Sequence, residues 1–108
     1  MNLLTETLRE KMKPDSDEKF IVDFYADWCG PCRLMTPIIE KVSEKLKNEG
    51  HQVSIYKFDI TKDKQIASEL GVRSIPAIKG FIGGENVISK VGVLSEEQLI
   101  NMANELIQ

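Results

Sequence analysis

Residues 20–26 form an almost uninterrupted apolar run, Phe-Ile-Val-Asp-Phe-Tyr-Ala, in which Asp23 is the only charge. A run this rich in aromatic and β-branched residues is typical of a strand buried on both faces, as in the centre of a parallel sheet. Such a strand needs covering elements on both sides, and these are usually the helices that connect it to its neighbours. The run therefore favours an α/β fold.

The rest of the chain alternates between helical and strand patterns. Apolar residues that recur every three or four positions predict helices at residues 3–12, 29–48 and 64–70 and from Ser95 onward. Short β-forming runs predict strands at residues 20–26, 53–59, 77–82 and 86–91. Gly83 and Gly84 join the last two strands as a hairpin, and Ser95 with Gln98 forms a capping box. We expect one domain spanning residues 1–108, with a central mixed β-sheet flanked by helices on both faces.

Composition excludes several classes of partner. A chain of 108 residues can bury a core without cross-links. Its formal net charge of -3 does not indicate a basic surface that would bind nucleic acid or an anionic membrane. It contains neither an apolar run of membrane-spanning length nor a recognisable secretory signal. We expect a monomer in the reducing cytoplasm whose partners are other proteins or small molecules.

The only two cysteines lie in the segment Trp28-Cys29-Gly30-Pro31-Cys32. A structural disulfide between them closes too small a loop to remove much entropy from the unfolded chain. In a reducing compartment such a pair is more often catalytic or metal-binding. Tetrahedral zinc takes about four ligands, and His51 is the only histidine, so one chain cannot complete a thiolate and imidazole site. A cluster shared by two chains stays open, and His51 is interpreted as a solvated loop residue.

Both thiols fall in the first turn of the predicted helix, on one face and within disulfide-bonding reach. Free backbone N–H groups and the helix dipole favour an anion there, most strongly at Cys29. This asymmetry predicts that Cys29 attacks a disulfide as a thiolate and that the shielded Cys32 resolves the mixed disulfide. Pro31 stiffens the turn and is expected to tune the redox potential.

The sequence resembles the thioredoxin family along essentially its whole length. The likeness rests on WCGPC after a buried strand carrying an aspartate, followed by Ile75-Pro76, Gly84 and Val91-Gly92. It implies the thioredoxin fold and a protein disulfide reductase, a dithiol electron carrier acting on client proteins through a mixed disulfide. It also implies no cofactor beyond the cysteine pair. Because the chain has no nucleotide-binding motif, a separate reductase is expected to supply the electrons.

The resemblance assigns further site residues. Asp23 matches the family's buried carboxylate, expected to exchange protons with Cys32, and Lys57 matches the lysine that tunes it. Burial raises a carboxyl pKa, which agrees with this role; the alternative is that both residues face solvent. Ile75-Pro76 matches a cis-proline turn that pairs with extended substrate. The expected substrate-binding surface comprises Trp28, Gly30, Pro31, Ile75, Pro76, Val91 and Gly92. For Trp28, core packing remains an alternative.

The chain departs from the family pattern at Lys79-Gly80, where bulky apolar residues are usual. Glycine weakens a strand and leaves volume unfilled, so we expect a bulge or compensation by a neighbour such as Phe81. Two other functions remain open: a disulfide oxidase or isomerase of the same fold, and a binding scaffold in which redox activity is incidental.

Overall fold

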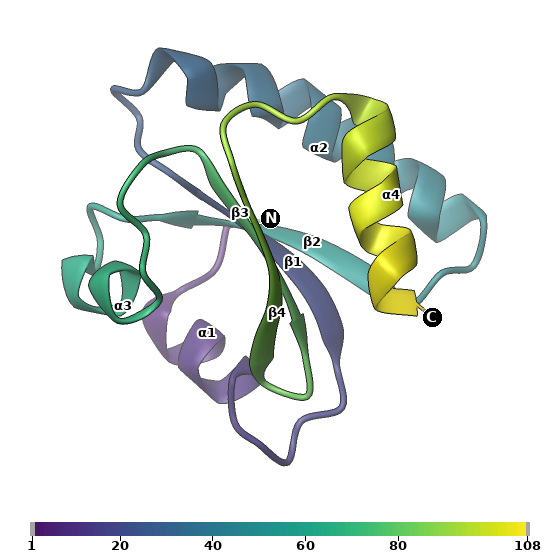
Figure 1. Ribbon diagram of the computed structural model, residues 1–108, viewed down its shortest axis with the longest axis horizontal. Helices are drawn as coiled ribbons and strands as arrows, with labels where there is room; N and C mark the ends of the chain where they lie inside the picture. The colour runs from purple at the N-terminus through teal and green to yellow at the C-terminus, as the bar shows by residue number, and fades with distance from the viewer. Residues whose placement is uncertain (1, 108) are drawn as a thin grey trace.

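The computed structural model describes residues 2–107 and has an α/β architecture in which helices cover both faces of a β-sheet (Figure 1). Within these residues, no helix combines the length and apolar character needed to span a membrane. The elements in chain order are α1 (Thr5–Lys11), β1 (Lys19–Tyr25), α2 (Gly30–Asn48), β2 (Val53–Asp59), α3 (Lys64–Glu69), β3 (Ala77–Ile82), β4 (Glu85–Val91) and α4 (Glu96–Ile107).

The sheet has the strand order β2-β1-β3-β4. β1 runs parallel to β2 and antiparallel to β3, and β3 runs antiparallel to β4, so the sheet is mixed as predicted. β1 is central, and residues 20–24 within it are all buried. The near-continuous apolar run therefore follows from burial on both faces of the sheet.

Helices cover each face of the sheet (Figure 1), and each face has its own core. One face packs against α2 and α4, through residues that include Ile21, Ile78, Met35, Val42 and Leu99. The other face packs against α1 and α3, through residues that include Phe20, Phe24, Phe81, Leu8 and Ile66. The expectation of helices on both faces is confirmed.

The N-terminal helix begins later than predicted. α1 starts at Thr5, and Leu4, which falls inside the predicted helix of residues 3–12, is 68% exposed. Leu3 is buried instead, and its backbone N–H donates a hydrogen bond to the Lys57 carbonyl oxygen at 2.8 Å. This bond extends the outer edge of β2 by a short parallel bridge. Such pairing depends on tertiary placement, which a helical periodicity does not report.

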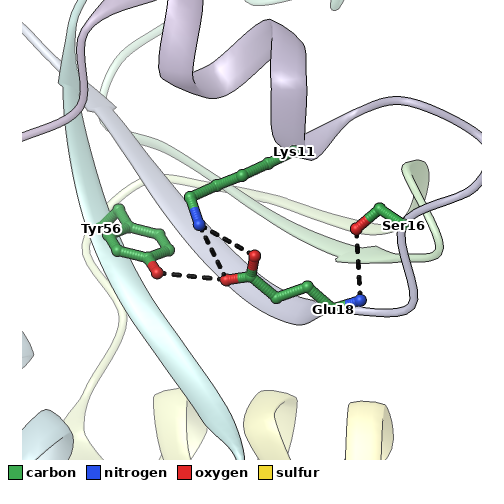
Figure 2. A network of polar contacts seen from close by, with 4 residues as sticks. All are labelled: Lys11, Ser16, Glu18 and Tyr56. Atoms are coloured by element: carbon green, nitrogen blue, oxygen red, sulfur yellow. Dashed lines mark hydrogen bonds and ion pairs between the residues drawn. The ribbon is translucent and has the colours of Figure 1, made fainter.

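A polar network fastens the end of α1 to the sheet (Figure 2). The Lys11 ammonium group donates to both carboxylate oxygens of Glu18, at 2.8 and 3.1 Å, and the Tyr56 hydroxyl donates to Glu18 at 3.1 Å. The Ser16 hydroxyl accepts a hydrogen bond from the Glu18 backbone N–H at 3.3 Å. Glu18 thus joins α1 to β2 at the entrance to β1.

The β3–β4 turn approaches the end of α1 closely at Gly84. Its φ of +81° lies in the left-handed region, and an added β-carbon would overlap the backbone carbonyl oxygens of Met12 and Lys13. Glycine is therefore needed here for the shape of the turn.

The expectation at Gly80, either a bulge or compensation by a neighbour such as Phe81, is confirmed by the bulge. The register between β3 and β4 does shift between Gly80 and Phe81, as a bulge requires. However, Phe81 packs in the core on the opposite face, and Leu106 and Met102 of α4 fill the space over Gly80. An added β-carbon would lie 3.2 Å from both δ-carbons of Leu106. The volume is filled because a neighbouring helix supplies the missing side chain.

Lys79 is almost fully buried in β3, at 8% exposure. Its ammonium group donates to the Ser89 hydroxyl at 3.0 Å and to the Asn86 side-chain oxygen at 3.4 Å. Asn86 in turn donates to the carbonyl oxygens of Gly80 and Ile88 at the bulge. Burial lowers the pKa of Lys79. The polar residue is accommodated because β4 places two acceptors within reach of its ammonium group.

Candidate active site

The cysteine segment joins the carboxyl end of β1 to the start of α2. Cys29 is the N-cap of α2, with an extended backbone (φ -87°, ψ 109°), and Pro31 lies in the first turn. The Cys29 N–H donates to the Ala26 carbonyl oxygen at 3.1 Å, and the Arg33 guanidinium donates to the Asp27 carbonyl oxygen at 2.8 Å. These bonds fix the loop, so both cysteines are held at the helix N-terminus as predicted.

Cys29 and Cys32 form a disulfide, with their Cα atoms 5.3 Å apart. The Cys32 backbone N–H donates a hydrogen bond to the Cys29 Sγ at 3.2 Å. The Cys29 sulfur therefore occupies the position of an N-cap acceptor, which satisfies one of the free N–H groups of the first turn.

The two cysteines differ less in exposure than the sequence predicts. Cys29 is 6% exposed and Cys32 is 2% exposed, so both are buried. Their sulfur atoms pack in a small cluster with Ala26, against Tyr25, Ile60 and Ile75. Cys29 is thus less open than its place at the helix tip suggested, because residues from neighbouring loops pack around it.

Several residues predicted for the substrate-binding surface lie beside Cys29. Ile75-Pro76 is a cis peptide, as expected, and the Ile75 carbonyl oxygen lies 3.9 Å from the Cys29 Sγ. The Gly92 N–H donates to the Pro76 carbonyl oxygen at 2.8 Å, which ties the end of β4 to this turn. Val91 is 68% exposed. The chain thereby brings two distant segments to the cysteine pair.

Trp28 is 71% exposed, so the alternative of core packing is wrong. Gly30 and Pro31, which follow Cys29 and complete the predicted surface, are also exposed. Exposed apolar side chains around a reactive group are typical of a surface that contacts other proteins.

Asp23 is fully buried in β1, and neither of its carboxyl oxygens has a hydrogen-bond partner among residues 2–107. Side chains alternate along a strand, so Asp23 shares a sheet face with Ile21, which packs in the core that α2 covers. Burial raises the pKa of Asp23 to about 7, although the charge of Lys57 partly offsets this effect. The solvent-facing alternative for Asp23 is therefore wrong.

Lys57 lies beside Asp23 in the register of β1 and β2. It is half-buried rather than fully outward-facing, and its ammonium group donates to the Thr36 hydroxyl at 2.9 Å. The same ammonium group lies 4.4 Å from the centre of the Tyr25 ring. Thr36 and Tyr25 were not predicted as site residues.

Ile60 was also not predicted as a site residue, although its position in the sequence could have indicated it. It follows β2, and the carboxyl ends of parallel strands share one edge of a sheet. The Ile60 N–H donates to the Tyr25 carbonyl oxygen at 2.9 Å, which holds it next to the cysteine cluster.

Among residues 2–107, no group of three or more His, Cys, Asp or Glu side chains is placed to hold a metal ion. His51 is half-buried, with its Nε2 3.4 Å from a Glu49 carboxylate oxygen.

The sequence model of the family described as Thioredoxin matches residues 2–105. The chain belongs to the thioredoxin family. A thioredoxin from Rickettsia felis is 39% identical over 106 residues, covering 98% of each chain. A thioredoxin from Borreliella burgdorferi is 40% identical over 90 residues, covering 82% of this chain and 74% of its own.

Solved thioredoxin structures have the same fold. The thioredoxin of Malassezia sympodialis superposes with a TM-score of 0.84 at 27% identity, covering 99% of this chain and 92% of its own. A mutant thioredoxin from Halobacterium salinarum gives a TM-score of 0.82 at 28% identity, covering 100% and 90%. The predicted thioredoxin fold is confirmed.

Family membership, together with a cysteine pair at disulfide distance, identifies a thiol-disulfide oxidoreductase that works as a dithiol protein disulfide reductase. Thioredoxins carry out this exchange on disulfide-bearing client proteins and receive electrons from a reductase. They do so without a prosthetic group, since the cysteine pair itself is oxidised and reduced.

Proposed function

We propose that Cys29 is the nucleophile of this reductase and that Cys32 resolves the mixed disulfide. One observation carries the assignment: the Cys29 Sγ accepts the Cys32 N–H at the N-terminus of α2. The same N–H and the positive end of the helix dipole stabilise a thiolate at Cys29 in the reduced protein. Cys32 lies within the first turn and has no equivalent place at the tip.

In the first step, the Cys29 thiolate attacks one sulfur of a client disulfide. A Cys29–client disulfide forms, the client's own S–S bond breaks, and the released client sulfur takes up a proton. In the second step, the Cys32 thiolate attacks the Cys29 Sγ. The Cys29–Cys32 disulfide forms and the second client sulfur leaves as a thiolate that takes up a proton from water, so two electrons pass from the protein to the client.

Asp23 is proposed as the group that accepts the Cys32 proton before the second step. A general base works best when its pKa lies near the operating pH, and burial places the pKa of Asp23 at about 7. Lys57, its neighbour in the sheet, tunes this value through its positive charge. The absence of hydrogen-bond partners on Asp23 within residues 2–107 leaves its oxygens free to take up a proton.

Client proteins are proposed to bind the exposed surface around Cys29. The exposed Trp28 and Val91 supply apolar contact area, and the Ile75 backbone at the cis-proline turn pairs with an extended client segment. Main-chain pairing reads few side chains, which suits many clients. A separate reductase of the thioredoxin reductase type is proposed as the electron donor.

We further propose that the 108 residues act as one monomeric thioredoxin domain in the cytoplasm. A dithiol reductant is useful where thiols are kept reduced, and the Gly-Pro pair between the cysteines favours a stable disulfide in the oxidised carrier.

Two cysteine variants test the assignment of roles. With a dithiol donor, the parent should reduce a protein disulfide catalytically, and Cys29→Ser should be inactive. Reduced Cys32→Ser, freed of the donor, should accumulate a covalent mixed disulfide with the client, detected by mass spectrometry. Trapping by Cys29→Ser instead of Cys32→Ser would reverse the roles, and an inactive parent would leave only the scaffold function.

A further inference from the structure

The Lys57 ammonium group does not bond to Asp23, although the two residues are partners in the register of β1 and β2. Neither carboxyl oxygen of Asp23 has a hydrogen-bond partner within residues 2–107, and Lys57 donates to the Thr36 hydroxyl instead. The positive charge therefore acts on Asp23 through space. Its effect depends on where the ammonium group is held.

Two side chains hold that ammonium group. Thr36 lies on α2, about one helical turn after Cys32, and its Oγ1 accepts the Lys57 hydrogen bond at 2.9 Å. The Tyr25 ring lies 4.4 Å from the ammonium nitrogen, within the range of a cation–π contact. The Tyr25 hydroxyl donates to the Asn2 side-chain oxygen at 3.1 Å, which fixes the ring in turn.

We propose that Thr36 and Tyr25 are positioning residues that keep the Lys57 ammonium group within electrostatic range of the Asp23 carboxyl group. Their importance for the resolving step rests on the proposed role of Asp23. Lys57 is half-buried on a flexible stem, so an ammonium group without these contacts relaxes toward water. Among residues 2–107, Lys57 supplies the positive charge that acts on Asp23, so without it nearby the carboxyl group becomes harder to ionise.

The other groups around Asp23 leave Lys57 as the main charge on it. β3 places the apolar Ile78 opposite Asp23. On β1 itself, Tyr25 is neutral near pH 7, because burial raises its pKa further above 10.0. On α2, Cys29 and Cys32 do not titrate while they form a disulfide.

The oxidised protein therefore gives a direct test. The Asp23 carboxyl carbon is followed by NMR across pH in the parent, Thr36→Val and Thr36→Ser. Valine keeps the shape of threonine but removes the acceptor, and serine retains it. We expect Thr36→Val to raise the Asp23 pKa by about 0.5 units, roughly threefold in the acid dissociation constant, and Thr36→Ser to stay close to the parent.

A Lys57→Met background separates positioning from a general structural effect. If Thr36 acts through Lys57, Thr36→Val produces no further shift once the ammonium group is gone. Tyr25→Leu is expected to behave in the same way, and Tyr25→Phe, which keeps the ring but loses the bond to Asn2, should have a smaller effect. An unchanged or lowered Asp23 pKa in Thr36→Val, or an equal rise in the Lys57→Met background, would overturn the proposal.

The resolving step provides a separate readout. The rate at which a preformed mixed disulfide is released is measured against pH for the parent and Thr36→Val. A midpoint that follows the Asp23 pKa supports both proposals. If the Asp23 pKa rises while the midpoint stays fixed, the positioning role stands and Asp23 is not the base.

Discussion

The Cys32 backbone N–H donates a hydrogen bond to the Cys29 Sγ, 3.2 Å away across the first turn of α2. The bond is directional, so it distinguishes two cysteines that differ little in exposure. It supports the sulfur that we propose as the attacking thiolate, Cys29, whereas Cys32 is proposed to resolve the mixed disulfide. The other proposed site residues are Asp23, which is buried in the sheet, and Trp28 and Val91, which are exposed on the surface.

Replacing Asp23 by asparagine should stabilise the protein at high pH. The unfolded chain loses this proton near pH ~4, whereas the folded chain loses it at about 7. Between these values the folded state holds the extra proton, so the parent's free energy of unfolding falls as pH rises and levels off above about 7. At pH 8, Asp23→Asn should be more stable than the parent by about 2–4 kcal/mol.

Denaturant unfolding at pH 4 and pH 8 measures this difference. At pH 4 the two proteins should have similar free energies of unfolding, because the carboxyl group is protonated in the folded parent. If the difference in free energy of unfolding between the two proteins does not change with pH, the result would contradict burial of an Asp23 carboxyl group without a hydrogen-bond partner among residues 2–107.

Trp28→Ala should impair reactions with protein substrates more than those with small disulfides. Because the side chain is 71% exposed, its removal should change the free energy of unfolding by less than about 0.5 kcal/mol. We expect a several-fold loss of kcat/KM for a protein disulfide and little change for a small one. The matched control is Val87→Ala, because Val87 is also exposed but lies near the start of β4, away from Val91. Equal losses for both substrates would place Trp28 in the chemistry instead of the docking surface.

Gly80→Val should destabilise the protein by about 1–3 kcal/mol, because the methyl groups overpack against Leu106 and Met102. Gly80→Ala should have a smaller effect, since its β-carbon meets only the flexible ends of those side chains. Thermal or denaturant unfolding compares the variants. A stabilised valine variant would show that the site contains free volume after all.

Glu18→Gln should weaken the attachment of α1 by about 1–2 kcal/mol, because it removes a carboxylate that accepts from both Lys11 and Tyr56. The matched control is Glu69→Gln, which breaks an exposed ion pair with Arg9 and should change stability by less than about 0.5 kcal/mol. Denaturant unfolding of both variants provides the comparison. Similar effects from the two would argue against a structural role for the network.

Much of the fold could be predicted because its signals are local. The apolar run of β1 and the Ser95–Gln98 capping box were confirmed, the latter with hydrogen bonds of 2.8 and 3.1 Å. Other features depend on contacts between distant elements. Leu106 over Gly80 and Thr36 on Lys57 arise only when helices pack on the sheet, so no sequence periodicity reports them.

The cysteine site likewise combines features that local sequence predicts with features that depend on distant segments. Helix-end physics predicted the place of Cys29 and its partner, and the resemblance added Asp23 and Pro76. The low exposure of Cys29 could not be predicted, because it comes from Ile60 and Ile75, which reach the cluster from separate loops. Burial is set jointly by segments far apart in the chain.

The most direct test of the account is the acidity of each thiol in the reduced protein. Alkylation rates are measured across pH, and mass spectrometry assigns the label to Cys29 or Cys32. We predict that Cys29 reacts first, with a midpoint clearly below the value near ~8.5 of a free thiol. Preferential labelling of Cys32, or a Cys29 midpoint at or above that of a free thiol, would contradict a thiolate held at the N-terminus of α2.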